Sequence, residues 1–190
     1  MEKSLTSPQQ KSITDSLRSE HQHQGPIVLE TNEYLERQKT FESNARSYPR
    51  RIPLALKKAS GVFVKNTQGQ VFIDCLAGAG TLALGHNHPN IITGLKKVLD
   101  SGLPLHTLDL TTPVKDQFVA DIFATLPQEF SKDAKIQFCG PTGADAVEAS
   151  IKLAKIATGR RTIFAFSGGY HGMTNGALSL MGNLAPKADV

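Results

Sequence analysis

Two glycine-rich stretches in the second half of the chain contain the residue types from which a ligand site can be built. GPTGADAVE covers residues 140–148, and SGGYHG covers residues 167–172. In the first stretch, Gly143 and Ala144 open a predicted helix, whose first backbone amides lack partners and whose dipole favours negative charge. This arrangement suits a single phosphate group. Thr142 is placed either to cap the helix or to donate its hydroxyl to that phosphate.

The spacing of the glycines disfavours nucleoside triphosphates and dinucleotides. A Walker A loop needs four residues between its glycines and a lysine after the second, whereas Gly140 and Gly143 are closer and no lysine follows. The same pair supplies only a fragment of the dinucleotide fingerprint. For this loop alone a purely structural interpretation stays open, because strand-to-helix turns often contain glycine and a capping residue for packing reasons.

The second stretch adds Tyr170 and His171 among three glycines. An aromatic ring near a phosphate loop suits stacking on a flat heteroaromatic ligand. A planar cofactor with one phosphate is pyridoxal 5′-phosphate or a flavin mononucleotide. The pair of stretches therefore favours a binding site over packing alone.

The surrounding sequence predicts how the two stretches are positioned. Residues 135–140 (KIQFCG) and 162–168 (TIFAFSG) are typical of strands, and the segment between them has a helical face and ends at Thr158-Gly159. Strand, helix and strand form a βαβ unit with a right-handed crossover. The predicted fold class is therefore α/β with a parallel sheet, and both loops open onto the same sheet edge.

Earlier in the chain, the pattern predicts smaller elements. GVFVKNTQGQVFID, residues 61–74, is typical of an antiparallel hairpin that turns between Asn66 and Gly69. One helix is predicted from Pro89 to Ser101-Gly102, and another begins at Pro113 after a Thr112 cap. Residues 1–25 are predicted to be a mobile polar leader, and residues 26–102 an amino-terminal segment with a hairpin and a helix.

Composition narrows the class of protein. Apolar residues make up 39% and charged residues 20% of the chain, with a net charge of +4, and no long block of like charge occurs. This favours a soluble protein that binds small anions over a nucleic-acid binder. No apolar run is long enough for a signal peptide or a membrane span, and Cys75 and Cys139 are interpreted as buried thiols of a reducing compartment, so we expect a cytoplasmic location. His86 and His88 lack a third ligand nearby, which favours a turn and helix entry over a metal site.

The spaced motifs carry a family resemblance. Residues 71–91 (VFIDCLAGAGTLALGHNHPNI) and 138–174 (FCGPTGADAVEASIKLAKIATGRRTIFAFSGGYHGMT) resemble the class III, fold type I pyridoxal-phosphate aminotransferases. Residues 46–61 (RSYPRRIPLALKKASG), taken with the GHNHP region, look most like the 2,4-diaminobutyrate aminotransferases within that class. The resemblance implies that residues 103–190 begin the large cofactor-binding domain of the fold type I architecture.

The resemblance also implies roles for residues. It assigns the cofactor phosphate to the amides of Gly143 and Ala144, beside Thr142. Tyr170 would stack on the pyridine ring with His171 next to it. Ala79 and Gly80 match family positions near the substrate, where small side chains leave room; tight packing against the hairpin is the alternative.

The activity implied is transfer of the terminal amino group of L-2,4-diaminobutyrate to 2-oxoglutarate, giving aspartate 4-semialdehyde and glutamate. Ornithine, acetylornithine or 4-aminobutyrate as donor, and a flavin- or nucleotide-binding α/β module, are the alternatives. Family members are homodimers with sites at the interface, which the segment GLPLHTLDLTTP would face. The lysine that binds the cofactor covalently is expected beyond residue 190, so no catalytic residue is assigned. We expect these residues alone to be inactive, as the amino-terminal part of a longer protein.

Overall fold

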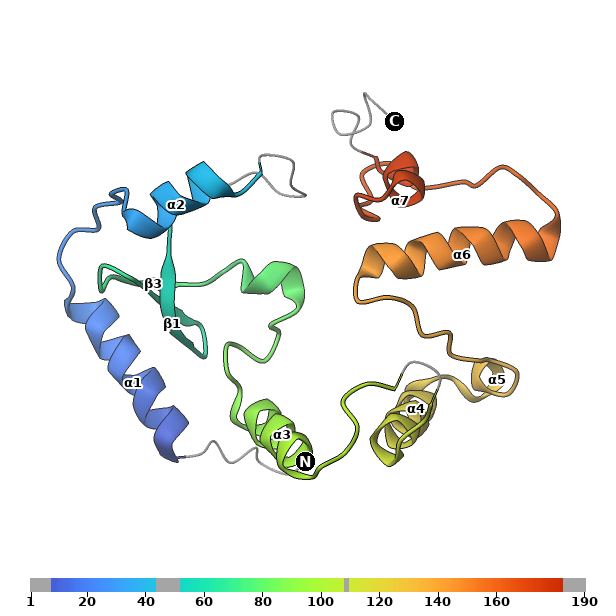
Figure 1. Ribbon diagram of the computed structural model, residues 1–190, viewed down its shortest axis with the longest axis horizontal. Helices are drawn as coiled ribbons and strands as arrows, with labels where there is room; N and C mark the ends of the chain where they lie inside the picture. The colour runs from blue at the N-terminus through green and yellow to red at the C-terminus, as the bar shows by residue number, and fades with distance from the viewer. Residues whose placement is uncertain (1–7, 44–51, 108–109, 183–190) are drawn as a thin grey trace. The chain divides into compact units, whose positions relative to one another are not determined.

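The structure is a computed structural model that describes residues 8–43, 52–107 and 110–182. It divides into two compact units, Met1–Leu108 and Asp109–Val190, and each is described by itself (Figure 1). Within the described ranges, every helix is too short or too polar to cross a membrane.

The first unit is built on a three-stranded antiparallel sheet in the order β1-β2-β3. Its strands are β1 (Leu56–Ser60), β2 (Phe63–Asn66) and β3 (Val71–Ile73). The predicted hairpin is confirmed as β2 and β3, with Gly69 at a φ of +92° in the turn. The buried Asn66 side chain braces this turn by accepting a hydrogen bond from the Gln70 amide at 2.8 Å. Strand β1 was not predicted, because its two lysines interrupt the apolar alternation.

A helix, α1 (Pro8–His23), covers this sheet, so the prediction of a mobile polar leader over residues 1–25 is wrong for the described part of that segment. Leu17 on α1 is fully buried against Phe63 and Val71, and Ile13 packs beside them. The physical reason is spacing. Ile13 and Leu17 are four residues apart, so two apolar side chains in a polar segment make one stripe when the segment is helical.

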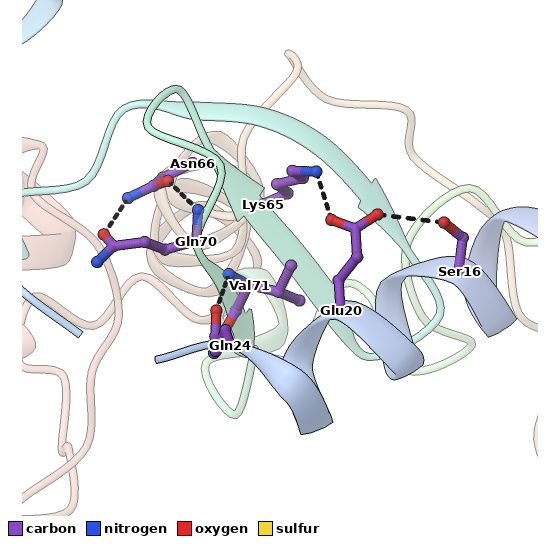
Figure 2. Close-up of polar contacts among 7 residues, drawn as sticks. All are labelled: Ser16, Glu20, Gln24, Lys65, Asn66, Gln70 and Val71. Atoms are coloured by element: carbon purple, nitrogen blue, oxygen red, sulfur yellow. Dashed lines mark hydrogen bonds and ion pairs between the residues drawn. The ribbon is translucent and has the colours of Figure 1, made fainter. Parts of the chain in front are cut away.

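Polar side chains fasten the end of α1 to the sheet (Figure 2). The Gln24 carboxamide accepts a hydrogen bond from the Val71 amide at 2.8 Å and donates one to the Val71 carbonyl at 2.6 Å. One side chain thereby satisfies both backbone groups of Val71 at the outer side of β3. The Glu20 carboxylate pairs with Lys65 on β2, and this hydrogen bond holds the pKa of Glu20 below its usual value.

A carboxylate orders the connection from β3 to α3 (Pro89–Asp100). Asp74 accepts hydrogen bonds from the amides of Leu76 at 2.9 Å and Ala77 at 3.0 Å, and its other oxygen lies 2.6 Å from His86 Nε2. The hydrogen bond to His86, and next the Ala77 amide, lower the pKa of Asp74. Because the His86 backbone also exchanges two hydrogen bonds with Gly61, both ends of the connection are fixed to the sheet.

The remaining described elements are helical. The first unit also contains α2 (Glu33–Phe41) and the short 3-10 helix η1 (Ala77–Gly80); the second contains α4 (Pro113–Thr125), α5 (Gln128–Ser131), α6 (Gly143–Thr158) and α7 (Asn175–Leu180). Two predicted boundaries are confirmed: Thr112 caps α4 by accepting from the Lys115 amide, and Gly159 ends α6 with a φ of +68°. The predicted end of α3 at Ser101 is confirmed as well.

Residues 135–140 and 162–168 differ from the prediction, because neither segment is a strand in the structure and the described sheet is wholly antiparallel. The aromatic side chains of the second segment, Phe164 and Phe166, are 96% and 92% exposed. A strand exists only when it is paired, and a parallel sheet also needs cover on both faces. The described residues provide neither partner strands nor cover. Cys75 and Cys139 are likewise exposed, not buried as expected.

The core under α1 gives a first prediction. Leu17→Ala should lower the free energy of unfolding by about 2–5 kcal/mol, the usual cost of emptying a fully buried leucine site. Equilibrium urea unfolding measures this, with Ser12→Ala on the exposed side of the same helix as the control. An equal, small effect of both substitutions would show that α1 does not pack on the sheet.

The Asp74 interaction gives a second prediction. Because its folded-state pKa is lowered, ionised Asp74 stabilises the fold above the ordinary aspartate pKa, and this stabilisation is lost as pH falls through the lowered value. Asp74→Asn should therefore lower the melting temperature at pH 7, and the difference from wild type should shrink as the pH is lowered below about 4. Asp100→Asn, at an exposed position, is the control. A difference that is constant with pH would contradict the role of the charge.

Candidate functional site

The first turn of α6 presents two backbone amides with no acceptor in the described residues, those of Gly143 and Ala144. Their neighbours are satisfied locally by a capping box. Thr142 Oγ1 accepts from the Asp145 amide at 3.3 Å, and Asp145 Oδ2 accepts from the Thr142 amide at 3.1 Å and the Thr142 hydroxyl at 2.8 Å. Thr142 is therefore the cap of the helix, and its hydroxyl already donates to Asp145. Only the next two amides remain as donors for an anion.

The second glycine-rich loop lies directly against this turn. Gly172 has a φ of +125°, and a Cβ placed on it would be 2.6 Å from the Ala144 Cβ. The absence of a side chain at Gly172 therefore lets the backbone after Tyr170 and His171 touch the start of α6. The prediction that the two loops are neighbours is confirmed by this contact.

The two polar rings of the second loop are not absorbed into a hydrophobic core. Tyr170 is 53% exposed. His171 Nε2 is shielded from solvent and has no hydrogen-bond partner in the described part of the chain. A shielded polar atom without a partner is costly in a protein and is the kind of atom that a ligand or an ordered water satisfies. Unpaired amides, an unpaired imidazole nitrogen and a half-exposed phenol ring on adjoining segments fit a planar ligand that carries one phosphate.

Glu148, one turn along α6 from Ala144, has a role that sequence reasoning missed. Its Oε1 accepts hydrogen bonds from the Thr174 hydroxyl at 2.6 Å, the Gly176 amide at 2.8 Å and the Ala177 amide at 3.2 Å. The Thr174 hydroxyl and then the Ala177 amide lower the pKa of Glu148. From spacing alone, the residue placed to pair with Glu148 is its helical i, i+4 neighbour Lys152. The true partners lie 26 to 29 residues away, so only the tertiary structure identifies them.

The residues expected near the substrate lie in the first unit, whereas the five expected at the cofactor lie in the second. Ala79 and Gly80 have φ values of +57° and +95°, and Ala77 and Gly78 before them are also left-handed. Such a run is strained for the two alanines and places four small residues in a tight 3-10 turn. Asp74 holds the start of this turn through the Ala77 amide.

The histidines of the GHNHP segment lie at a turn and at the entry to a helix. His86 pairs with Asp74, and His88 directly precedes Pro89 at the start of α3, with its Nδ1 shielded and unpaired. Among the described residues no three His, Cys, Asp or Glu side chains are grouped so as to hold a metal ion.

Comparison with known proteins identifies the family of this chain. The family model for aminotransferase class III matches residues 44–189. A diaminobutyrate–2-oxoglutarate aminotransferase of Rhizobium meliloti (strain 1021) is 68% identical over 157 residues, which are 83% of this chain and 33% of the relative. A protein of the same name from Haemophilus influenzae is 58% identical over 162 residues, 85% of this chain and 35% of the relative. The chain thus spans about a third of the length of these curated relatives.

Solved structures share the fold. A taurine:2-oxoglutarate aminotransferase from Bifidobacterium kashiwanohense, in complex with PLP and glutamate, superimposes with a TM-score of 0.71 at 23% identity, over 87% of this chain and 36% of that one. An omega transaminase from Pseudomonas jessenii gives a TM-score of 0.68 at 19% identity, over 83% of this chain and 37% of that one. Since the family model covers most of the sequence and the fold agrees, the chain belongs to the class III aminotransferase family.

Proposed function

We propose that the whole protein to which this chain belongs is a pyridoxal-phosphate-dependent aminotransferase. It transfers the terminal amino group of L-2,4-diaminobutyrate to 2-oxoglutarate and gives aspartate 4-semialdehyde and glutamate. The proposed substrates rest on the 68% identity to a relative named for diaminobutyrate and 2-oxoglutarate. Three further relatives at 40% to 58% identity, from Haemophilus, Wolinella and Nocardia, have names with the same two compounds.

The second unit supplies the cofactor contacts. The amides of Gly143 and Ala144 bind the phosphate, and Thr142 fixes the helix start through its capping box with Asp145. Tyr170 stacks on the ring, and His171 lies beside it with its unpaired Nε2 available for a hydrogen bond. Bound pyridoxal phosphate supplies an electron sink for the carbon from which a proton is removed. The chain's own part is to hold the phosphate and orient the ring.

From the family resemblance, Ala79 and Gly80 are proposed to lie near the substrate, where an alanine methyl group and a glycine without a side chain leave room for it. The lysine that would bind the cofactor covalently is proposed to lie in the part of the relatives' length that this chain does not span, as the family resemblance implies. We further propose a cytoplasmic homodimer with sites at the subunit interface. Family resemblance supports this assembly.

The cofactor site predicts different effects of two substitutions at one residue. In the full-length protein, Tyr170→Ala should raise the dissociation constant of pyridoxal phosphate by roughly fivefold, because an aromatic stacking contact is worth about 1 kcal/mol. Tyr170→Phe keeps the ring and should stay close to wild type. Absorbance titration of the cofactor-free protein measures both, and equal effects of the two substitutions would contradict stacking.

The activity itself is tested by a panel of amino donors. The purified full-length protein should show the visible absorbance band of bound pyridoxal phosphate, and borohydride should bleach it. With 2-oxoglutarate as acceptor, glutamate should form fastest from diaminobutyrate, compared with ornithine, acetylornithine and 4-aminobutyrate. Preference for another donor would contradict diaminobutyrate as the substrate but would leave the assignment as an aminotransferase unchanged. A flavin spectrum would instead favour the alternative flavin-binding module.

A further inference from the structure

The loop that carries Tyr170 and His171 is tied to α6 at two points on one face of the helix. Ala144 touches Gly172 at the first point. Four residues later, Glu148 binds Thr174 and the first amides of α7. Residues i and i+4 of a helix lie one above the other, so both contacts belong to one surface strip. The segment from Gly172 to Ala177 is thereby fixed to the same helix that presents the free amides.

The contact at Glu148 depends on charge. All three partners of Oε1 are donors, and a hydrogen bond to an ionised acceptor is roughly twice as strong as one between neutral groups. The lowered pKa of Glu148 has the same origin, since these donors favour the carboxylate. Gly176 completes the fit, because any side chain there would overlap the Glu148 carboxylate.

The contacts of Ala144 and Glu148 affect Tyr170 and His171, because these two residues immediately precede the fixed segment in the chain. Tyr170 is half exposed, so burial fixes its ring only in part. His171 Nε2 makes no hydrogen bond within the described residues. The backbone that follows both residues, which Ala144 and Glu148 hold in place, therefore contributes to the orientation of the two rings.

We infer that Glu148 is a positioning residue for the cofactor ring: it acts through Thr174 and the first turn of α7, and does not touch the cofactor. The inference rests on the proposed function, since it assigns Tyr170 and His171 to pyridoxal phosphate. Fixing a binding loop before the ligand arrives removes an ordering cost from binding. Loss of the tie should therefore appear in the affinity for the cofactor and in its spectrum.

The test uses three variants of the full-length protein. Glu148→Ala removes the acceptor, Glu148→Gln keeps the shape but not the charge, and Thr174→Val removes one hydroxyl from an exposed residue. Glu129→Gln, an exposed glutamate in the same unit, is the matched control. Each variant is prepared without cofactor, and its melting temperature is measured. Pyridoxal phosphate is then titrated in, which gives the dissociation constant and the absorption maximum of the bound cofactor.

The expected order follows from the hydrogen bonds removed. Glu148→Ala should raise the dissociation constant by roughly tenfold, and Thr174→Val and Glu148→Gln by less, each with a shifted absorption maximum; the control should match wild type. If Glu148→Ala does not fold, the affinity and the absorption maximum of Thr174→Val test the inference in its place. Lower melting temperatures with wild-type affinity and spectrum would make the tie merely structural and overturn the inference. A wild-type protein without any cofactor band would instead overturn the proposed function, and this inference with it.

Discussion

A helix that starts in a sharp turn leaves backbone amides that its own carbonyls cannot reach, and the second unit is arranged around two of them. Thr142 and Asp145 satisfy each other and thereby define where α6 begins. Gly143 and Ala144 lie between them without acceptors in the described residues. Glycine at the first of these positions keeps side-chain atoms away from the approach to the amide, and the short methyl group of Ala144 instead contacts the backbone of Gly172. The same turn thus offers donors outward and a packing surface to the neighbouring loop.

Side chains that bind backbone groups are the common device of both units. Gln24 binds both polar groups of Val71, Asp74 binds two consecutive amides, and Glu148 binds the amides that open α7. Gln24 and Glu148 link segments that no strand or helix ladder connects, whereas the Asp74 bonds order the turn that directly follows it. Buried apolar area in the first unit is small, centred on Leu17, Phe63 and Val71. Backbone groups held by charged or amide side chains therefore carry much of the ordering of the loops.

Local chemistry allowed much of this to be predicted from sequence. The hairpin, the starts of α3 and α4 and both ends of α6 follow from glycine, proline and capping residues at fixed positions. The nearness of the two glycine-rich loops was also predictable, although the reasoning used a parallel strand pair that the described residues do not form. Strand pairing depends on partners far along a chain, so a local pattern such as TIFAFSG shows propensity and not pairing.

Other features depended on contacts that spacing alone does not reveal. Helix α1 was missed because its segment is polar in composition, and its two buried residues, Ile13 and Leu17, gain meaning only when the sheet beneath them is known. The partners of Glu148 were missed, because its three donors lie 26 to 29 residues further along the chain, after the rest of α6 and a long loop. Family resemblance supplied the assignment of Ala79 and Gly80. The structure adds that these residues occupy a left-handed turn, which glycine adopts freely and which is strained for alanine.

The position of Gln24 has a consequence for the behaviour of the chain outside its own fold. Strand β3 ends the sheet, and an exposed last strand with free amides and carbonyls is a template on which strands of other molecules can add. The carboxamide of Gln24 occupies both groups of Val71 at this border, and α1 lies over the adjoining residues. While α1 stays docked, Gln24 therefore keeps the Val71 backbone groups at this one edge from pairing with a strand of another molecule.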